Sequence, residues 1–342
     1  MTKAAQQNIL VIRNDKLGDF MLAWPALALL RRNLPKARIA VLVPSYTAPL
    51  AEACSYVDEV IVDPKLKGGW RNGMALARLI KPHGFDAVIT LFSRFDTGLA
   101  VWRAGIPLRY APATKLAQIF YNRRITQRRS RSEKPEYEYN LDLTRTYLLE
   151  QGTARPKPVE APYLAFPSAG IQKLKRAFLK QHKIAAGRQL VFVHTGHGGS
   201  ADNLSVGQYG HLIRDLSAPR KRHFVLTAGP GEEHQVKRLA NLVEGPHTVW
   251  VSRAGLVDFA KYLAFADLFI SGSTGPLHLA AALDRPTAAF YPRRRSSTAL
   301  RWQTVNHEDR RLAFMPPEKA DESDMQSIDV DQAAAKIAKQ LL

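Results

Sequence analysis

The feature that most constrains the fold is an alternation of short apolar runs with longer amphipathic segments. In the first half, four apolar runs have the length of strands: Ile9–Ile12, Ile39–Val43, Glu59–Val62 and Ala87–Leu91. Segments of helical character fall between them, near residues 20–33, 46–55 and 70–81. Alternation of this kind is typical of a parallel sheet whose crossover connections are helices. The first half therefore predicts an α/β domain.

The alternation stops and then resumes in the second half. Residues 108–140 are rich in Arg, Lys and Tyr and have no clean period, and residues 155–170 contain four prolines, which indicates a linker. Further strand-like runs occur in "QLVFVHTG", "HFVLTAGPGEEH", "HTVWVS", "ADLFISGSTGPLHLAAAL" and, as the last strand, "PTAAFYP". The final segment "IDVDQAAAKIAKQLL" predicts a helix with Val330, Ala334, Ile337 and Leu341 on one face.

The predicted architecture is two doubly wound α/β domains followed by a helix. We expect the domains at 1–160 and 161–325 and the helix within 326–342, and a chain of 342 residues is long enough for two domains. Folds of this kind bind ligands at the carboxyl ends of their strands. Two such halves facing each other predict a ligand-binding cleft between them.

The net charge of the chain limits the classes of partner that it can bind. Lys and Arg number 49 against 30 Asp and Glu, which gives a formal charge of +19 and favours nucleic acid, an anionic membrane or a phosphorylated substrate. Arginines crowd "YNRRITQRRSRSEK" at 121–134 and form the run Arg293–Arg295. The single cysteine, Cys54, excludes a disulfide framework and a thiolate metal cluster within one chain. No signal peptide and no apolar run of membrane-spanning length is visible, so we expect a cytoplasmic protein that meets a membrane only by charge.

Two loops of the second half carry residues suited to a nucleotide. "HTGHGGSADN" follows a predicted strand, and Thr195, Gly196 and Ser200 offer amides and hydroxyls to a phosphate. This loop lacks the P-loop lysine and the dinucleotide glycine spacing, so an ordinary surface loop is the alternative. In "TAGPGEEH", Glu232 or Glu233 is suited to ribose hydroxyls or a base. The alternative is a pair of acids that the dipole of a following helix favours.

A third loop leads into a helix in "SGSTGPLHLAAAL". Ser273 or Thr274 is suited to cap this helix, and Gly275 allows a close backbone approach. A helix start with free N–H groups and hydroxyls is an anion site, and His278 in the first turn is placed to face the same anion. A helix cap with a histidine at the edge of the core is the alternative. Because all three loops follow strands of one half, we expect them to gather at one edge of one sheet.

Asp19 stands in the first strand–helix turn, within "RNDKLGDFMLAWPALALL". One interpretation is an acid that the helix dipole favours. The other is a general base at the cleft that takes a proton from an acceptor hydroxyl. The turn alone does not decide between them.

These motifs together resemble the glycosyltransferase family 9 heptosyltransferases, which build the inner core of lipopolysaccharide. The resemblance covers nearly the whole chain. It rests on "ILVIRNDKLGDFMLAWPALALLRRNLPKARI", "AGIPLRYA", "FYNRR", "HTGHGGSADN", "AGPGEEH" and "STGPLHLAAALDRPTAAFYP". It implies a GT-B fold of two Rossmann-like domains, with the acceptor on the N-terminal domain and the nucleotide sugar on the C-terminal domain.

The resemblance also implies a reaction and roles for single residues. The donor would be ADP-L-glycero-D-manno-heptose, transfer would invert the anomeric carbon, and neither a metal nor another cofactor is expected. Asp19 matches the family's base. The donor side takes its residues from the three loops described above: Thr195, Gly196, Ser200, Glu232, Glu233, Ser273, Thr274, Gly275 and His278.

On the acceptor side, the resemblance implies an anionic substrate. Lys16, Arg94, Arg123 and Arg124 fall where the family handles its acceptor. That acceptor, Kdo-modified lipid A, lies in an anionic membrane, which would account for the basic excess. We therefore expect a peripheral protein on the cytoplasmic face of the inner membrane that does not bind nucleic acid.

The sequence departs from the family pattern at two donor positions. Many members carry Lys or Arg before Asn-Trp in the phosphate loop, whereas this chain has Asp202 before Asn203 and Leu204, so another basic residue would have to replace that cation. Many members also have Asp where this chain has Ser273. Both changes bear on which sugar nucleotide is the donor.

Other functions remain open from the sequence. A family 9 transferase could use another sugar nucleotide, a later core position or a protein acceptor. A nucleotide-sugar epimerase of the same shape and a catalytically dead donor-binding relative are further alternatives. A nucleic-acid-binding protein fits the charge, but the sequence has no zinc spacing, RNP motif or basic zipper.

Overall fold

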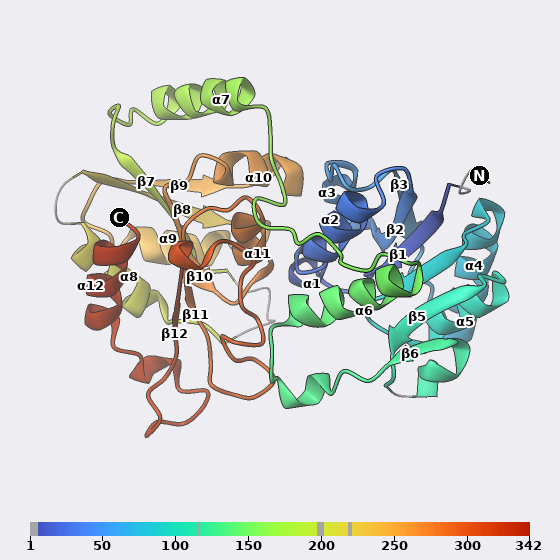
Figure 1. Cartoon of the computed structure of the whole chain (residues 1–342). Helices are drawn as coiled ribbons and strands as arrows, with labels where there is room; N and C mark the ends of the chain where they lie inside the picture. Colours follow the sequence, from blue (N-terminus) through green and yellow to red (C-terminus); the bar gives the residue numbers. More distant parts are fainter. Residues whose placement is uncertain (1–5, 115, 197–201, 218–220) are drawn as a thin grey trace. The chain divides into compact units, whose positions relative to one another are not determined.

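The computed structural model describes residues 6–114, 116–196, 202–217 and 221–342, and the chain divides into two compact units. The N-terminal unit comprises Met1–Ser130 with Glu136–Val159, and the C-terminal unit comprises Arg131–Pro135 with Glu160–Leu342. Each unit has a six-stranded sheet in which neighbouring strands run parallel (Figure 1). The predicted α/β class is confirmed.

The sheet of the N-terminal unit has the order β3-β2-β1-β4-β5-β6. Its strands are β1 (Asn8–Ile12), β2 (Arg38–Pro44), β3 (Glu59–Asp63), β4 (Ala87–Thr90), β5 (Leu108–Pro112) and β6 (Arg123–Ile125). The first four strands match the predicted apolar runs. The last two lie within residues 108–140, for which no period was expected. The strand β6 gives little signal in the sequence because it has only three residues and begins with two arginines.

Helices cover both faces of this sheet. They are α1 (Leu17–Met21), α2 (Trp24–Asn33), α3 (Ala48–Glu52), α4 (Gly69–Ile80), α5 (Phe95–Arg103) and α6 (Glu136–Glu150), with 3₁₀ turns η1 (Ser45–Thr47), η2 (Lys81–His83) and η3 (Leu116–Phe120). The helix predicted near 20–33 is two helices, because Pro25 has no N–H to bond the preceding turn. One core cluster joins α4 and α5 to the sheet through Leu76, Ile80 and Val101, and α2 packs against α6.

The C-terminal unit repeats the plan with the strand order β12-β11-β10-β7-β8-β9. Its strands are β7 (Gln189–His194), β8 (Arg222–Ala228), β9 (His247–Val251), β10 (Leu268–Gly272), β11 (Thr287–Phe290) and β12 (Arg311–Phe314). The run "PTAAFYP" is therefore not the last strand. The edge strand β12 follows it, and sequence patterning missed β12 because it has only four residues, begins with arginine and is not fully buried.

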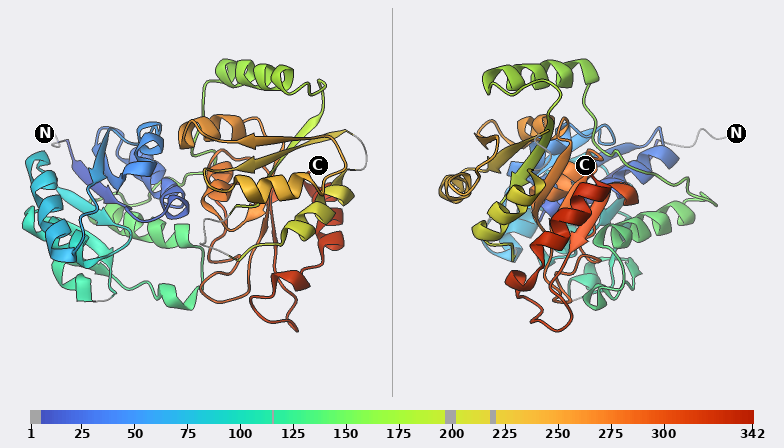
Figure 2. Two further views of the ribbon diagram at one scale, coloured as in Figure 1. Left: turned by 180° about the vertical axis from the view of Figure 1, so that it is seen from behind. Right: turned by 90° about the vertical axis from the view of Figure 1, so that its left-hand side faces the viewer.

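The helices of this unit are α7 (Ser168–Gln181), α8 (Val206–Leu216), α9 (Glu233–Ala240), α10 (Leu256–Leu263), α11 (Gly275–Ala282) and α12 (Val330–Gln340), with 3₁₀ turns η5 (Glu308–Arg310) and η6 (Met325–Ser327); another turn, η4 (Arg129–Arg131), carries the chain from one unit to the other. The proline-rich stretch has no helix or strand until α7 begins. The closing helix α12 lies beside α8 (Figures 1 and 2) and buries Val330, Ala334 and Ile337, the face that its sequence predicts.

Glycine at position 73 permits the close packing of α4 on α5. A Cβ atom at Gly73 would lie 2.8 Å from Leu99 Cδ2 and 3.0 Å from the carbonyl oxygen of Asp96. We expect Gly73→Ala to lower the free energy of unfolding by about 1–3 kcal/mol, because the backbone oxygen cannot move aside as a side chain would. Denaturant unfolding measures this change.

The matched control is Gly170→Ala in α7, where nothing lies within 4 Å of an added Cβ atom. Alanine there should raise stability by up to about 1 kcal/mol, because it restricts the unfolded chain and favours the helix. Equal effects of the two substitutions would contradict the tight packing of α4 on α5.

Candidate active site

Three loops of the C-terminal unit meet at one edge of its sheet. The strands β10, β7 and β8 are neighbours and parallel, so the loops that follow them leave from the same edge. The carbonyl oxygen of Thr195, after β7, accepts a hydrogen bond from Gln235 Nε2 on α9 at 3.2 Å and from Asn203 Nδ2 at 3.0 Å. The expected convergence of the loops is therefore present, and hydrogen bonds hold it.

Glu232 is fixed against the first loop. A Cβ atom at Gly196 would overlap the Glu232 carboxylate where it now stands, so glycine here permits this close approach. Glu232 Oε2 accepts from the backbone N–H of Gly229 at 2.9 Å, and Glu233 Oε2 accepts from that of Gly231 at 2.9 Å. Both acids thus stand at the start of α9 and bond its preceding turn. Ser200 lies outside the described residues.

His194 joins the same cluster, although sequence reasoning did not select it. Its Nδ1 is 3.0 Å from Thr227 Oγ1, and its Nε2 is 3.6 Å from Glu232 Oε2. Burial lowers the pKa of His194, and the nearby Glu232 charge partly opposes that shift. The signal available in the sequence was a polar residue at the last position of an apolar strand.

The third loop presents the start of α11. Thr274 occupies the N-cap position with an extended backbone, yet its hydroxyl makes no cap bond. Among the described residues, neither Thr274 Oγ1 nor His278 Nδ1 has a hydrogen-bond partner, although both side chains are buried. Burial lowers the pKa of His278 to about 4, so its imidazole is neutral at pH 7. Unpaired donors at a helix N-terminus are suited to an anion.

Asn203 ties the first and third loops together. Its Oδ1 accepts from Tyr209 OH at 2.7 Å and from the Leu204 N–H at 2.9 Å. A Cβ atom at Gly272 would lie 2.5 Å from the same oxygen, so glycine at the end of β10 allows Asn203 this position. The loop after β7 is thereby pinned beside the loop that carries Ser273 and Thr274.

A cation stands next to this junction. Arg294, in the loop after β11, forms an ion pair with Asp202. Asp202 is the position at which the resemblance led us to expect a basic residue. A guanidinium from another loop therefore reaches the position that lost the expected charge.

In the N-terminal unit, Asp19 lies in α1 just after β1. Its Oδ1 accepts from Arg13 Nη2, while Arg13 Nε donates to Asp15 Oδ1 at 2.9 Å. Arg13 is 2% exposed, whereas the Asp19 and Asp15 side chains are 14% and 16% exposed. A buried guanidinium thus holds two partly accessible carboxylates, and no hydrogen bond from the described residues reaches Asp19 Oδ2.

The network continues into α6. Arg13 Nη1 lies 3.5 Å from Glu136 Oε1 and 3.3 Å from Asn140 Oδ1, and Arg129 Nη1 donates to the same Glu136 oxygen at 2.7 Å. Burial alone would lower the pKa of Arg13, but the three carboxylates outweigh it and raise that pKa above its ordinary value. Burial raises the pKa of Asp15, the Asp19 charge adds to this, and Arg13 opposes it.

Sequence reasoning did not select Arg13, Glu136, Arg129 or Asn140 for the site. A charged residue at the end of an apolar strand was a signal for Arg13. Glu136 and Asn140 lie more than 120 residues further along the chain, and no local pattern links them to it.

The predicted acceptor residues lie on different elements of the N-terminal unit. Lys16 is exposed beside Asp19, at the N-cap of α1. Arg94 caps α5, and its guanidinium bonds Asp96 through Nε and Nη2, each at 3.1 Å. Arg123 donates to Glu150 Oε2 at 3.0 Å on the α6 side of β6. Arg124, the next residue of the strand, points to the opposite face.

Comparison with known proteins assigns the chain to a family. The model of glycosyltransferase family 9 (heptosyltransferase) matches residues 74–328. The chain is 49% identical over 337 residues to a Haemophilus influenzae protein named "putative glycosyltransferase", covering 97% of this chain and 96% of that protein. The chain belongs to glycosyltransferase family 9.

More distant relatives fit the same assignment. Lipopolysaccharide heptosyltransferase 1 of Salmonella typhimurium is 25% identical over 299 residues, which are 83% of this chain and 87% of that protein. The structure of E. coli heptosyltransferase WaaC with ADP superposes with a TM-score of 0.73 at 20% identity, covering 98% of this chain and all of that one. The predicted GT-B fold is confirmed, and the protein is a glycosyltransferase whose family implies a nucleotide-sugar donor.

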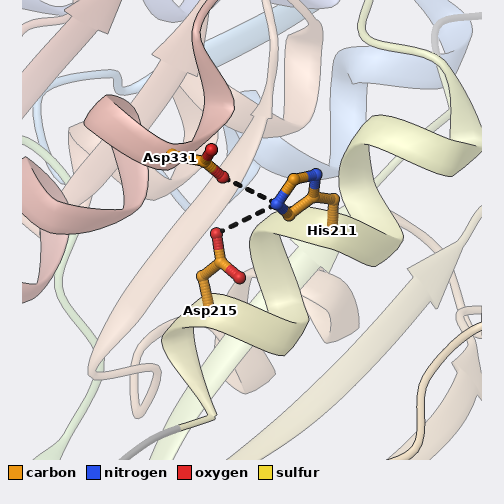
Figure 3. Close-up of side chains that lie close together, drawn as sticks. All are labelled: His211, Asp215 and Asp331. Carbon is orange, nitrogen blue, oxygen red and sulfur yellow. Dashed lines mark ion pairs between the residues drawn. The ribbon is translucent and has the colours of Figure 1, made fainter.

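The transferase also has a group of potential metal ligands away from the strand ends. His211 and Asp215 on α8 face Asp331 in the first turn of α12 (Figure 3). His211 Nε2 is 2.6 Å from Asp331 Oδ1 and 3.3 Å from Asp215 Oδ2. With Nε2 protonated, this imidazole joins α8 to α12. The contact therefore has a structural explanation, which is that it holds the last helix in place.

A membrane span is not part of the described fold. Within the ranges that the structure describes, no helix combines the length and the apolar character needed to cross a bilayer.

The buried imidazole of His278 makes stability depend on pH. Its pKa is about 4 in the folded transferase and about 6.5 when unfolded, so the unfolded chain binds more protons between these values. Stability should therefore fall as pH decreases from 6.5 to 4. Between pH 6.5 and pH 4, the free energy of unfolding should fall less in the His278→Asn variant than in wild type. We expect the two decreases to differ by up to ~3 kcal/mol.

Denaturant unfolding at a series of pH values measures this difference. His223, whose pKa burial also lowers to about 4, is present in both proteins and cancels from the comparison. Parallel stability curves for wild type and variant would contradict a neutral, buried His278.

Proposed function

We propose that this transferase moves a heptose from ADP-L-glycero-D-manno-heptose to the Kdo/heptose inner core of lipopolysaccharide. The reaction inverts the anomeric carbon and needs no metal, and Asp19 is the general base. The observation that carries this proposal is the Asp19 carboxylate, held by buried Arg13 at the end of β1 and yet partly open to solvent. A base must be both oriented and accessible, and this carboxylate is both.

The proposed chemistry is a single displacement. The acceptor hydroxyl gives its proton to Asp19 as its oxygen forms a bond to the anomeric carbon. The bond from that carbon to the diphosphate breaks on the opposite side, and ADP leaves with the electron pair. Arg13 keeps the carboxylate in position before the proton moves, since its guanidinium stays charged throughout.

The donor side would stabilise the leaving diphosphate with fixed donors. The first N–H groups of α11 and the unpaired Thr274 hydroxyl offer hydrogen bonds, and Arg294 offers a guanidinium that it shares with Asp202. Preorganised donors of this kind stabilise charge that develops in the transition state. Glu232, beside Gly196, is suited to accept from the ribose hydroxyls of the nucleotide.

Relatives and charge support the substrate. Lipopolysaccharide heptosyltransferase 1 of Salmonella typhimurium is related over most of its length. A phosphorylated, carboxylated acceptor in an anionic membrane suits a chain with a formal charge of +19. We infer that the transferase works in the cytoplasm, peripherally on the cytoplasmic face of the inner membrane.

Two positions favour an alternative function in which the donor is a different sugar nucleotide. Ser273 and Asp202 depart from the family pattern, and both lie in the donor loops. A family 9 transferase that uses another sugar nucleotide, or a protein acceptor, would keep the base and the anion site. Assaying purified sugar nucleotides one at a time separates these candidates.

The base assignment is tested by replacing each of two similar carboxylates. We expect Asp19→Asn to lower kcat by roughly 10²–10⁴-fold, because the amide cannot accept the proton. The measurement is release of ADP from ADP-heptose with a truncated Kdo-lipid A acceptor in the absence of added metal.

Asp15→Asn is the matched control, because Asp15 also pairs with Arg13 and has nearly the same exposed fraction. It should retain kcat within about tenfold of wild type. Loss of activity in both variants would assign the effect to the ion network. Retained activity in Asp19→Asn would remove Asp19 as the base.

The donor site is tested at a hydroxyl that the fold does not use. Thr274→Val keeps the shape but removes the hydroxyl. Since no described residue bonds that hydroxyl, the variant should be at least as stable as wild type. We expect ADP to bind about 2–10-fold more weakly, as measured by calorimetry. Unchanged ADP affinity would exclude Thr274 from the anion site.

A further inference from the structure

One face of the N-terminal unit exposes several large apolar side chains. Leu116 and Ile119, on η3, are 85% and 70% exposed, and Phe95 and Trp102 on α5 and Trp70 on α4 are about half exposed. A 3₁₀ turn has three residues per turn, so positions 116 and 119 project on the same side. Ala117, between them, is buried against the unit instead.

The elements that carry these side chains contact one another. The ring of Phe120 lies 5.5 Å from that of Phe95 and 6.0 Å from that of Trp102, which joins η3 to α5. A Cβ atom at Gly69 would lie 3.3 Å from Phe95 Cδ1, so the start of α4 adjoins the same ring. We call the surface formed by Trp70, Phe95, Trp102, Leu116 and Ile119 the apolar face.

The segment of the chain that carries the apolar face has charged residues that are almost all basic. Residues 64–132 contain 14 Lys and Arg but only two acids, Asp86 and Asp96. Asp96 is buried and engaged by Asn72 and Arg94, and Asp86 precedes β4, where it accepts from the Asn8 N–H. Asp96 compensates Arg94, and acids of α6 compensate Arg123 and Arg129, so most of the basic residues in this segment have no acid partner within it.

Basic residues stand on the same elements as the apolar side chains. Arg71 follows Trp70 on α4, and Arg103 follows Trp102 on α5, with its guanidinium 5.2 Å from the Trp102 ring centre. Arg124 on β6 points to the face of the sheet that α4 and α5 cover, as its pairing with Ala111 requires.

We propose that the apolar face is the surface by which this transferase docks onto an anionic lipid bilayer. Leu116 and Ile119 enter the acyl boundary, the tryptophans lie at the headgroup level and the arginines pair with lipid phosphates. Charge decides against a second copy of the chain, because two such faces would bring like charges together. The inference rests on the proposed function only in that its substrate is a membrane glycolipid.

The test is flotation of the full chain with vesicles at physiological salt. We expect binding to vesicles that contain phosphatidylglycerol and little binding to vesicles of phosphatidylcholine alone. Leu116→Ser with Ile119→Ser should lower the partition coefficient at least about tenfold. Arg71→Glu with Arg103→Glu should lower it similarly, and the effect should shrink as salt rises.

The control is Leu149→Ser with Leu242→Ser, two leucines outside the apolar face, on α6 and after α9, whose side chains are about half exposed. This control should bind vesicles as wild type does. The proposal would be overturned if the Leu149/Leu242 control lost as much vesicle binding as the Leu116/Ile119 variant. Equal binding of wild type to neutral and anionic vesicles would also overturn it. The proposal would also be overturned if the arginine variant lost binding to an oligonucleotide or to a second copy of the chain while its binding to vesicles stayed unchanged.

Activity on a soluble, truncated acceptor separates this inference from the proposed function. The Leu116/Ile119 variant should keep its kcat/KM on that acceptor within about twofold, because neither residue is part of the donor or base sites. Lost vesicle binding with intact transfer supports the docking surface. Vesicle binding without any heptose transfer would leave the surface in place and refute the proposed reaction.

Discussion

The N-terminal unit depends on one buried guanidinium. Arg13 follows the first strand directly and contacts Asp15, Asp19 and Glu136, so three carboxylates share one cation in the interior of the unit. Removing that cation would leave Asp15 and Asp19 without their partner in a partly buried place and Glu136 with Arg129 alone, which is costlier than losing a surface ion pair. Because Glu136 comes from α6, the same contact that orients Asp19 also holds the last helix of the unit to its first strand. The architecture of the fold and the orientation of the candidate base are thus one constraint.

The C-terminal unit solves a different problem with backbone geometry. Its loops approach one another so closely that a Cβ atom at Gly196 would overlap the Glu232 side chain, and one at Gly272 the Asn203 side chain, as these now stand. Close packing of this kind leaves Thr274 and His278 buried without partners inside the described structure. Unpaired buried donors are costly in a finished protein and become favourable when a ligand completes them. The proposed donor site is therefore one of the places where buried polar atoms of the described residues remain without a partner.

The departures from the family pattern gain a physical meaning in this arrangement. Asp202 replaces an expected cation and pairs with Arg294 from the loop after β11, so the junction holds an ion pair in place of an unpaired positive charge. Ser273 has a hydroxyl where many members have a carboxylate. The hydroxyl and backbone donors of the proposed anion site are thus kept, while its charge and its contacts to the sugar are open to change. This combination fits a transferase that keeps its reaction and adjusts its donor.

The sequence by itself determined the α/β class, the two repeated halves, the motifs of the three donor loops and the position of Asp19, because each is written in local periodicity or in a short motif. It did not reveal β5, β6, α6 or β12, since short edge strands and a helix with scattered apolar residues carry little periodic signal. Only the tertiary structure brought Glu136 and Asn140 to Arg13 and Arg294 to Asp202, and it alone placed Phe120 of η3 beside Phe95 and Trp102 of α5. Such contacts join residues far apart in the chain, and the crossover topology, not any local pattern, decides them.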